Sequence, residues 1–151
     1  MRIIKGFDYR QEEAIAWARK RMGLHGPHGR SMAISMINER NQFVAVTVYS
    51  GFTEVNIDMH IAAKPGARWA TPAYFNASFR FPFVQYQAQR ITGLVRSGTP
   101  HIGEFLTRLG FVLEGRLRKA FPEGDDLLMY GFLKEDFFNH RWYDGGKHEA
   151  K

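Results

Sequence analysis

Apolar residues recur at helical spacing in three stretches of the chain. The first stretch predicts a helix over residues 9–22, capped by Asp8, with acidic residues in its first turn and basic residues in its last. Its apolar side consists of Ala14, Trp17, Ala18 and Met22. The second stretch begins at Thr71-Pro72, which is typical of a helix cap followed by proline in the first turn, and Pro82 should kink or shorten this helix.

The third helical stretch is predicted to open at Thr99-Pro100, by the same chemistry as Thr71-Pro72. Its apolar side consists of Ile102, Phe105, Leu106 and Leu109. Gly110 follows the last apolar position, and a glycine there can adopt the left-handed conformation that ends a helix without steric cost. We therefore expect the helix to stop at Gly110 and a strand to begin at Phe111.

Six shorter apolar runs are typical of β-strands. They are Met32–Ile37, Phe43–Tyr49, Val55–Ala63, Ile91–Val95, Phe111 to about Phe121, and Leu127–Leu133. The first three are close in sequence, which favours an antiparallel meander. In the third run, Val55, Ile57, Met59 and Ile61 alternate with Asn56, Asp58 and His60, so the two sets should lie on opposite faces of a sheet.

The order of elements is therefore α-β-β-β-α-β-α-β-β. It predicts a single α+β domain over residues 1–138, followed by a flexible tail over residues 139–151. Strand, helix and strand over residues 55–96 form a crossover unit, which implies one parallel pair within an otherwise antiparallel mixed sheet. The amino end of a helix at such a junction favours an anion, because its free N–H groups and positive dipole end point at the ligand.

The composition narrows the classes of function. The 151 residues include no cysteine, which excludes disulfides, thiol catalysis and cysteine-ligated metals. The sequence shows no signal peptide and no apolar run long enough to span a membrane, so we expect a cytoplasmic protein without a membrane partner. The net charge of +6 favours anionic partners, namely a phosphorylated cofactor, an acidic protein surface or nucleic acid.

After the third predicted helix the chain reads Leu109-Gly110-Phe111, and Glu114-Gly115 follows. This segment resembles the GCN5-related N-acetyltransferase superfamily, which typically reads Leu-Gly-Phe after a helix and then Glu-Gly. With the order of elements, the resemblance covers about residues 30–138 and is closest to the branch that includes the ribosomal-protein N-terminal acetyltransferases. It implies a V-shaped split between the two parallel strands, in which acetyl-coenzyme A would lie.

The resemblance also implies a cofactor site, with the pyrophosphate of acetyl-CoA on the helix that opens at Pro72. The residues implied in binding are Lys64, Gly66, Ala67, Arg68, Trp69, Ala70 and Thr71, together with Ser97 and Thr99 after the second parallel strand. The family's phosphate loop usually reads Gln/Arg-x-x-Gly-x-Gly/Ala, and Gly66 is the only glycine in residues 64–71 here, so Lys64 and Arg68 are expected to add direct charge. Trp69 either stacks on the adenine or packs in the core. The family's usual general-acid tyrosine is Leu106 here, which cannot donate a proton.

Three side chains are candidates for the base that takes a proton from an acceptor amine: His60, Asp58 and Glu54. His60 and Asp58 are two residues apart on one strand and share a face. The alternative for His60 is a strand-end histidine satisfied by a backbone carbonyl. His25 and His28 are candidates for acceptor binding. We expect no metal site, because their spacing is short and no third ligand is near in the sequence.

Two classes of function fit these observations. The first is an acetyl-CoA-dependent N-acetyltransferase that acts on a primary amine of a protein N-terminus, a lysine or a small molecule. Transfer would be direct within a ternary complex, since no cysteine is present to carry a covalent acyl group. The second is a non-catalytic binding module on the same fold, which would hold an acidic protein or nucleic acid with its basic face. A homodimer is compatible with either class.

Overall fold

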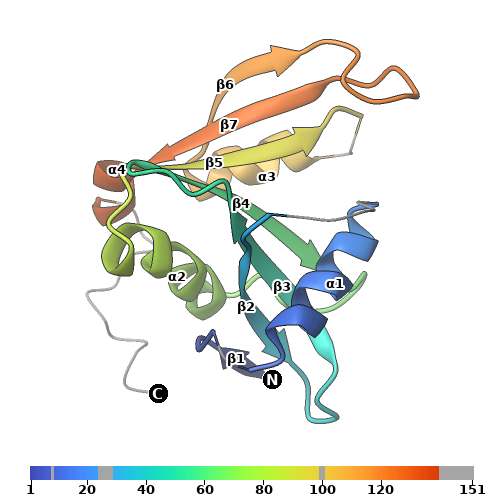
Figure 1. Ribbon diagram of the computed structural model, residues 1–151, viewed down its shortest axis with the longest axis vertical. Coiled ribbons are helices and arrows are strands. Elements are labelled where there is room, and N and C mark those ends of the chain that lie inside the picture. Colours follow the sequence, from blue (N-terminus) through green and yellow to red (C-terminus); the bar gives the residue numbers. More distant parts are fainter. Residues whose placement is uncertain (8, 24–28, 99–100, 140–151) are drawn as a thin grey trace.

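A seven-stranded sheet in the order β1-β2-β3-β4-β5-β7-β6 forms the centre of the molecule (Figure 1). The computed structural model describes residues 1–7, 9–23, 29–98 and 101–139. The strands are β1 (Arg2–Ile4), β2 (Met32–Ile37), β3 (Phe43–Ser50), β4 (Asn56–Ala63), β5 (Arg90–Arg96), β6 (Val112–Leu117) and β7 (Leu127–Leu133). The helices are α1 (Gln11–Arg21), α2 (Pro72–Arg80), α3 (Ile102–Leu109) and α4 (Lys134–Phe138), and a π-helical turn, η1 (Phe81–Gln85), continues α2.

The sheet is mixed in the way that the crossover unit predicts. β4 and β5 are parallel, and every other neighbouring pair of strands is antiparallel. The predicted single-domain α+β architecture is therefore confirmed. Each described helix is too short to span a bilayer.

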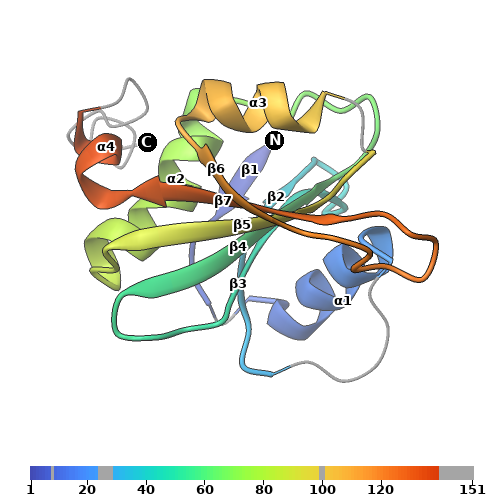
Figure 2. The same cartoon turned by 90° about the horizontal axis from the view of Figure 1, so that it is seen from above.

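Helices cover both faces of the sheet (Figure 2). α1 packs on one face, where Ala14, Ile15 and Ala18 lie in one buried cluster with Val46 and Val48 of β3. α2 and α3 lie on the other face, over a second cluster that is rich in aromatic rings. Its largest buried rings are Tyr49, Tyr74, Phe75, Phe79, Phe83, Phe132 and Phe137. The two apolar faces explain why central strands such as β3 are apolar along nearly their whole length.

Pro82 changes the helical geometry after α2, as its position predicts. Proline has no N–H, so Pro82 cannot donate a hydrogen bond to the carbonyl of Ser78 one turn earlier. The chain widens into η1, with the N–H of Tyr86 donating to the carbonyl of Phe81 at 2.8 Å. The vacated Ser78 carbonyl accepts a hydrogen bond from the hydroxyl of Tyr49 at 2.6 Å, which ties α2 to β3. Burial of this hydroxyl raises the pKa of Tyr49.

The structure contains two elements that the sequence pattern missed. β1 is three residues long and pairs with β2, and α4 follows β7 directly at Lys134. Both are too short to show a clear period of apolar residues. The expected strand through Phe121 also ends earlier, at Leu117, because Lys119 takes a left-handed conformation and its N–H bonds to the Asp126 side chain.

Three predicted boundaries were also wrong. α1 begins at Gln11 after Arg10, which has φ of 47°, and Asp8 lies outside the described residues. α3 begins at Ile102 after His101, without a side-chain cap, and Thr99 and Pro100 lie outside the described residues. Val55 was expected to begin the strand and to share a face with Ile57, but it precedes β4 and is 49% exposed. Its carbonyl instead accepts hydrogen bonds from the N–H groups of Gln89 and Arg90.

Gly110 ends α3 as predicted. Its φ is 111°, and its N–H donates to the carbonyl of Thr107. A Cβ atom at this position would lie 2.7 Å from Cε1 of Phe132, whose ring is buried in the core. Gly110 is therefore required both by the backbone conformation and by the close approach of the helix end to the ring.

We expect Gly110→Ala to lower the free energy of unfolding by about 2–3 kcal/mol, because a strained conformation and a steric overlap add together. Urea denaturation measures this change. The matched control is Gly124→Ala, since Gly124 has φ of 96° but nothing within 4 Å of its Cβ position. The control should lose about 1 kcal/mol. Equal losses in the two variants would show that the contact with Phe132 contributes nothing.

Candidate functional site

The candidate site begins where the two parallel strands separate. β4 and β5 are joined by four residue pairs, from Asn56 with Arg90 to Met59 with Gly93. Beyond that row, β4 continues to Ala63 along β3, and β5 continues to Arg96 along β7, without a further pair between them. The facing backbone groups of both strands are then available to a ligand, since a sheet edge carries unpaired N–H and C=O groups. Figure 1 shows the two strands diverging.

The loop between β4 and α2 borders the split on the β4 side. Pro65 and Gly66 form the middle of a tight turn, closed by a hydrogen bond from the N–H of Ala67 to the carbonyl of Lys64 at 3.2 Å. The φ of Gly66 is 77°, as the third residue of a type II turn requires. Thr71 caps α2, with its hydroxyl accepting from the N–H of Tyr74, and Pro72 follows as predicted. The conformation of Gly66 is thus explained by the turn itself.

Two cations project from this loop. Lys64 and Arg68 are exposed, and within the described part of the chain neither forms an ion pair. Ala70 is also exposed. Trp69 packs edge-on against Tyr74, Phe75 and Phe105, with ring-centroid separations of 5.7–6.3 Å, which favours the packing alternative for this side chain. It links the loop and α2 to α3.

The residues expected after β5 are only partly described. Ser97 lies in the turn after β5, where its N–H donates to the carbonyl of Asp126 and its hydroxyl accepts from the N–H of Asp126. These contacts hold the turn against the connection between β6 and β7. Thr99, the other expected cofactor residue on this side, lies outside the described residues.

A hollow of about 530 Å³ lies on the α1 face of the sheet, next to the split. It is lined by the last turns of α1, residues 29–31, the end of β3 with the following loop, and His60 of β4. His60 is the first β4 residue beyond the last pair with β5, and its side chain is on the same face as Asn56 and Asp58. His60 therefore connects the hollow with the split.

His60 is suited to accept a proton. Burial disfavours the imidazolium and lowers its pKa, and the carboxylate of Asp58 opposes this shift only in part. The Asp58 carboxylate itself lies against Gly51 in the wall of the hollow, so closely that a Cβ at Gly51 would overlap it. The imidazole is therefore neutral at pH 7, with a carboxylate nearby.

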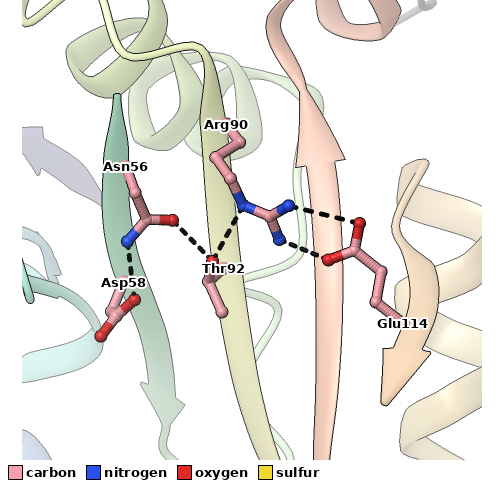
Figure 3. Close-up of polar contacts among 5 residues, drawn as sticks. All are labelled: Asn56, Asp58, Arg90, Thr92 and Glu114. Carbon is pink, nitrogen blue, oxygen red and sulfur yellow. Dashed lines mark hydrogen bonds and ion pairs between the residues drawn. The ribbon is translucent and has the colours of Figure 1, made fainter. Parts of the chain in front are cut away.

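Asp58 is the end of a line of polar contacts that crosses the sheet (Figure 3). The amide of Asn56 donates to Asp58 at 3.0 Å, and the hydroxyl of Thr92 donates to the Asn56 carbonyl oxygen at 2.6 Å. Nε of Arg90 donates to the Thr92 hydroxyl at 3.2 Å, and its two terminal nitrogens bind the carboxylate of Glu114. We call Asp58, Asn56, Thr92, Arg90 and Glu114 the polar line.

The polar line gives Glu114, the glutamate of the Glu-Gly pair, a structural role. Glu114 lies at an irregularity in the pairing of β6 with β7, and its carboxylate passes over Gly131 of β7, where a side chain would overlap it. It thereby reaches Arg90 on β5. Sequence reasoning did not find Asn56, Thr92 or Arg90, since each is an ordinary strand residue until the parallel register brings them together. The feature of the sequence that pointed to this line was the alternation in β4, which places Asn56 on the same face as Asp58.

The other sequence candidates are dispersed. Glu54 is exposed in the loop before β4, at the opposite end of the strand from His60. His25 and His28 lie outside the described residues, although residues 29–31 beside them line the hollow. Leu106, in the position of the family's tyrosine, packs partly buried against the aromatic cluster.

The mixed sheet, its parallel strands that separate and its helix order constitute the GCN5-related N-acetyltransferase fold. Comparison with solved structures shows the same architecture in spermidine N-acetyltransferases. A chimera of SpeG from Vibrio cholerae and hSSAT has a TM-score of 0.65 at 15% identity, over 85% of this chain and 82% of that chain. Spermidine/spermine N-acetyltransferase SpeG from Vibrio cholerae, solved with manganese ions, has a TM-score of 0.64 at 15% identity, over 85% and 77%.

At this level of identity the likeness shows the fold alone. No protein-family model matches the sequence, and a search of curated proteins found no match. Nothing in these comparisons supports the ribosomal-protein N-terminal acetyltransferase branch that the sequence suggested.

We expect Thr92→Val to lower the free energy of unfolding by about 1–3 kcal/mol, because it removes the hydroxyl at the centre of the polar line and leaves the Asn56 oxygen without its donor. Chemical denaturation of both proteins measures the loss. The matched control is Thr107→Val, since the exposed Thr107 hydroxyl bonds only within α3. Its change should stay within about 0.5 kcal/mol. A Thr92→Val protein as stable as the parent would contradict a stabilising role for the line.

Proposed function

We propose that this protein transfers the acetyl group of acetyl-CoA to a primary amine. The observation that carries the proposal is the separation of β4 and β5 after Met59 and Gly93, with a neutral histidine at the start of the gap. The shared fold of the spermidine N-acetyltransferases supports it. Acetyl-CoA supplies an activated thioester, whose acetyl carbon an amine can attack.

The residues around the split suit acetyl-CoA. The unpaired backbone edge of β4 from His60 to Ala63 offers hydrogen bonds to a ligand that contains amides. Lys64 and Arg68 present positive charge beside the amino end of α2, where a pyrophosphate is favoured. The N–H groups of Ala67 and Thr71 donate to carbonyls within the loop and cannot bind phosphate. The two cations compensate for the loss of these backbone donors.

His60 acts as the base in this proposal. An amine is nucleophilic only when neutral, and the imidazole, held next to the hollow on the α1 face, removes its proton. A bond forms between the amine nitrogen and the acetyl carbon while the carbon–sulfur bond breaks. The products are the N-acetylated amine and CoA. The leaving thiolate is stable enough to depart unprotonated, because a thiol has a pKa of about 8.5. Leu106 therefore does not prevent the reaction.

The second candidate function is a non-catalytic module on this fold. The single glycine of the phosphate loop and the leucine at position 106 favour it. The release of free CoA distinguishes an enzyme from a binding module, because only the enzyme releases it when acetyl-CoA and an amine are both present. Tight acetyl-CoA binding without release across a broad amine panel would support the module.

We expect Arg68→Ala to weaken acetyl-CoA binding by about 1.5–3 kcal/mol, the range for a charge-assisted hydrogen bond to phosphate. Isothermal titration calorimetry measures the dissociation constant. The control is Arg2→Ala, which removes the same charge from β1, the edge strand at the far side of the sheet. If both variants bind like the parent, the phosphates lie elsewhere.

We expect His60→Ala to lower turnover about 100-fold, the lower end for loss of a general base, with little change in acetyl-CoA affinity. In the parent, the rate should fall only below about pH 6.5, since burial lowers the His60 pKa from its usual value and protonation then requires more acid. Release of CoA across pH 5–9 measures both effects. His101→Ala, which removes an exposed imidazole, is the control. A variant as fast as the parent at every pH would exclude His60 as the base.

A further inference from the structure

Two arginines line the hollow on the α1 face. Arg19 comes from the last turn of α1, and Arg30 comes from the segment before β2. The guanidinium of Arg30 stacks over the ring of Phe52, 5.1 Å from its centroid, and Phe52 also lines the hollow. This stacking holds the planar group in place beside the hollow and preorganises it for a ligand.

The hollow carries an uneven distribution of charge. None of its described lining residues is acidic. The carboxylate of Asp58 lies against Gly51, one of the lining residues, and acts electrostatically on His60 at the same end of the hollow. One end therefore favours an ammonium group beside a base, and the arginines favour an anion.

We infer that the acceptor is a small amine that also carries an anionic group, a carboxylate or a phosphate, which Arg19 and Arg30 bind while the amine faces His60. This inference rests on the proposed acetyl transfer and names its acceptor class. A guanidinium matches the two oxygens of either anion through paired hydrogen bonds. The volume of about 530 Å³ is within the usual range for small-molecule sites.

The same charges act against a polyamine. Spermidine, the substrate named for the solved structures of similar fold, has several positive groups and would place them next to two guanidiniums. Like charges at such short range in a partly enclosed site repel each other. This chain therefore shares the fold of those enzymes but selects acceptors of a different charge.

The test compares acceptors in matched pairs. Free amino acids are measured against their primary amides, phosphoethanolamine against ethanolamine, and spermidine serves as the polycation. The parent should have a kcat/KM at least about tenfold higher for the anionic member of a pair, which corresponds to about 1.4 kcal/mol. The two pairs distinguish a carboxylate acceptor from a phosphate acceptor.

Arg30→Gln should lower the ratio of kcat/KM between the anionic and the neutral acceptor by at least about tenfold. It should do so by raising KM for the anionic acceptor, while kcat/KM for the neutral acceptor stays the same. Lys20→Gln is the control. Lys20 is an exposed cation on the same turn of α1 as Arg19, and it does not line the hollow. An equal loss of preference in Lys20→Gln would be caused by the lower net charge of the protein and would overturn the assignment of Arg30.

The outcomes separate this inference from the proposed function. If the parent acetylates neutral amines or spermidine as well as anionic ones, the acceptor class is wrong and the acetyltransferase proposal stands. If the parent acetylates nothing, calorimetry with the same acceptors in the presence of CoA still tests whether the hollow prefers the anionic member of each pair. Tighter binding of the anionic member, lost in Arg30→Gln, supports the anion site even then, and equal binding overturns it.

Discussion

The short parallel seam between β4 and β5 is the constraint on which the rest of the structure depends. It consists of four residue pairs and is the point where the sheet changes from the β1–β4 half to the half formed by β5, β7 and β6. The polar line strengthens it, running from Asp58 through Thr92 to Glu114. Beyond the seam the strands separate, so the last residue pair of the seam determines where the gap between β4 and β5 begins.

Some of the positive charge of the chain is held in ion pairs, and some of it lies beside the split and the hollow. Three arginines around β5, β6 and β7 form ion pairs, with Arg90 bound to Glu114, Arg96 to Asp125 and Glu123, and Arg116 to Asp126. Lys64, Arg68 and Arg30 have no ion pair within the described residues and lie beside the split or the hollow. Part of the net charge of +6 is therefore located beside the split and the hollow.

Much of the fold could be predicted from the sequence because local rules determine it. The Thr71-Pro72 start of α2, the change of helix at Pro82 and the glycine stop at Gly110 all depend on backbone chemistry within one turn. The crossover from β4 to β5 follows from the order of elements and the handedness of such units. β1 and α4 were missed because three and five residues carry too little pattern.

The sequence by itself determined the order of the longer elements and the parallel pair. It also placed His60 and Asp58 on one face of a strand, since they are two residues apart. Only the tertiary structure decided the length of the seam, the polar line and the hollow. Thr92 and Arg90 join Asn56 through the register of β4 with β5, and Glu114 reaches Arg90 because Gly131 leaves room above β7. Arg19 and Arg30 line one hollow because the last turn of α1 and the segment that leads into β2 both border it. Contacts between distant segments depend on register and packing, which no local pattern of residues encodes.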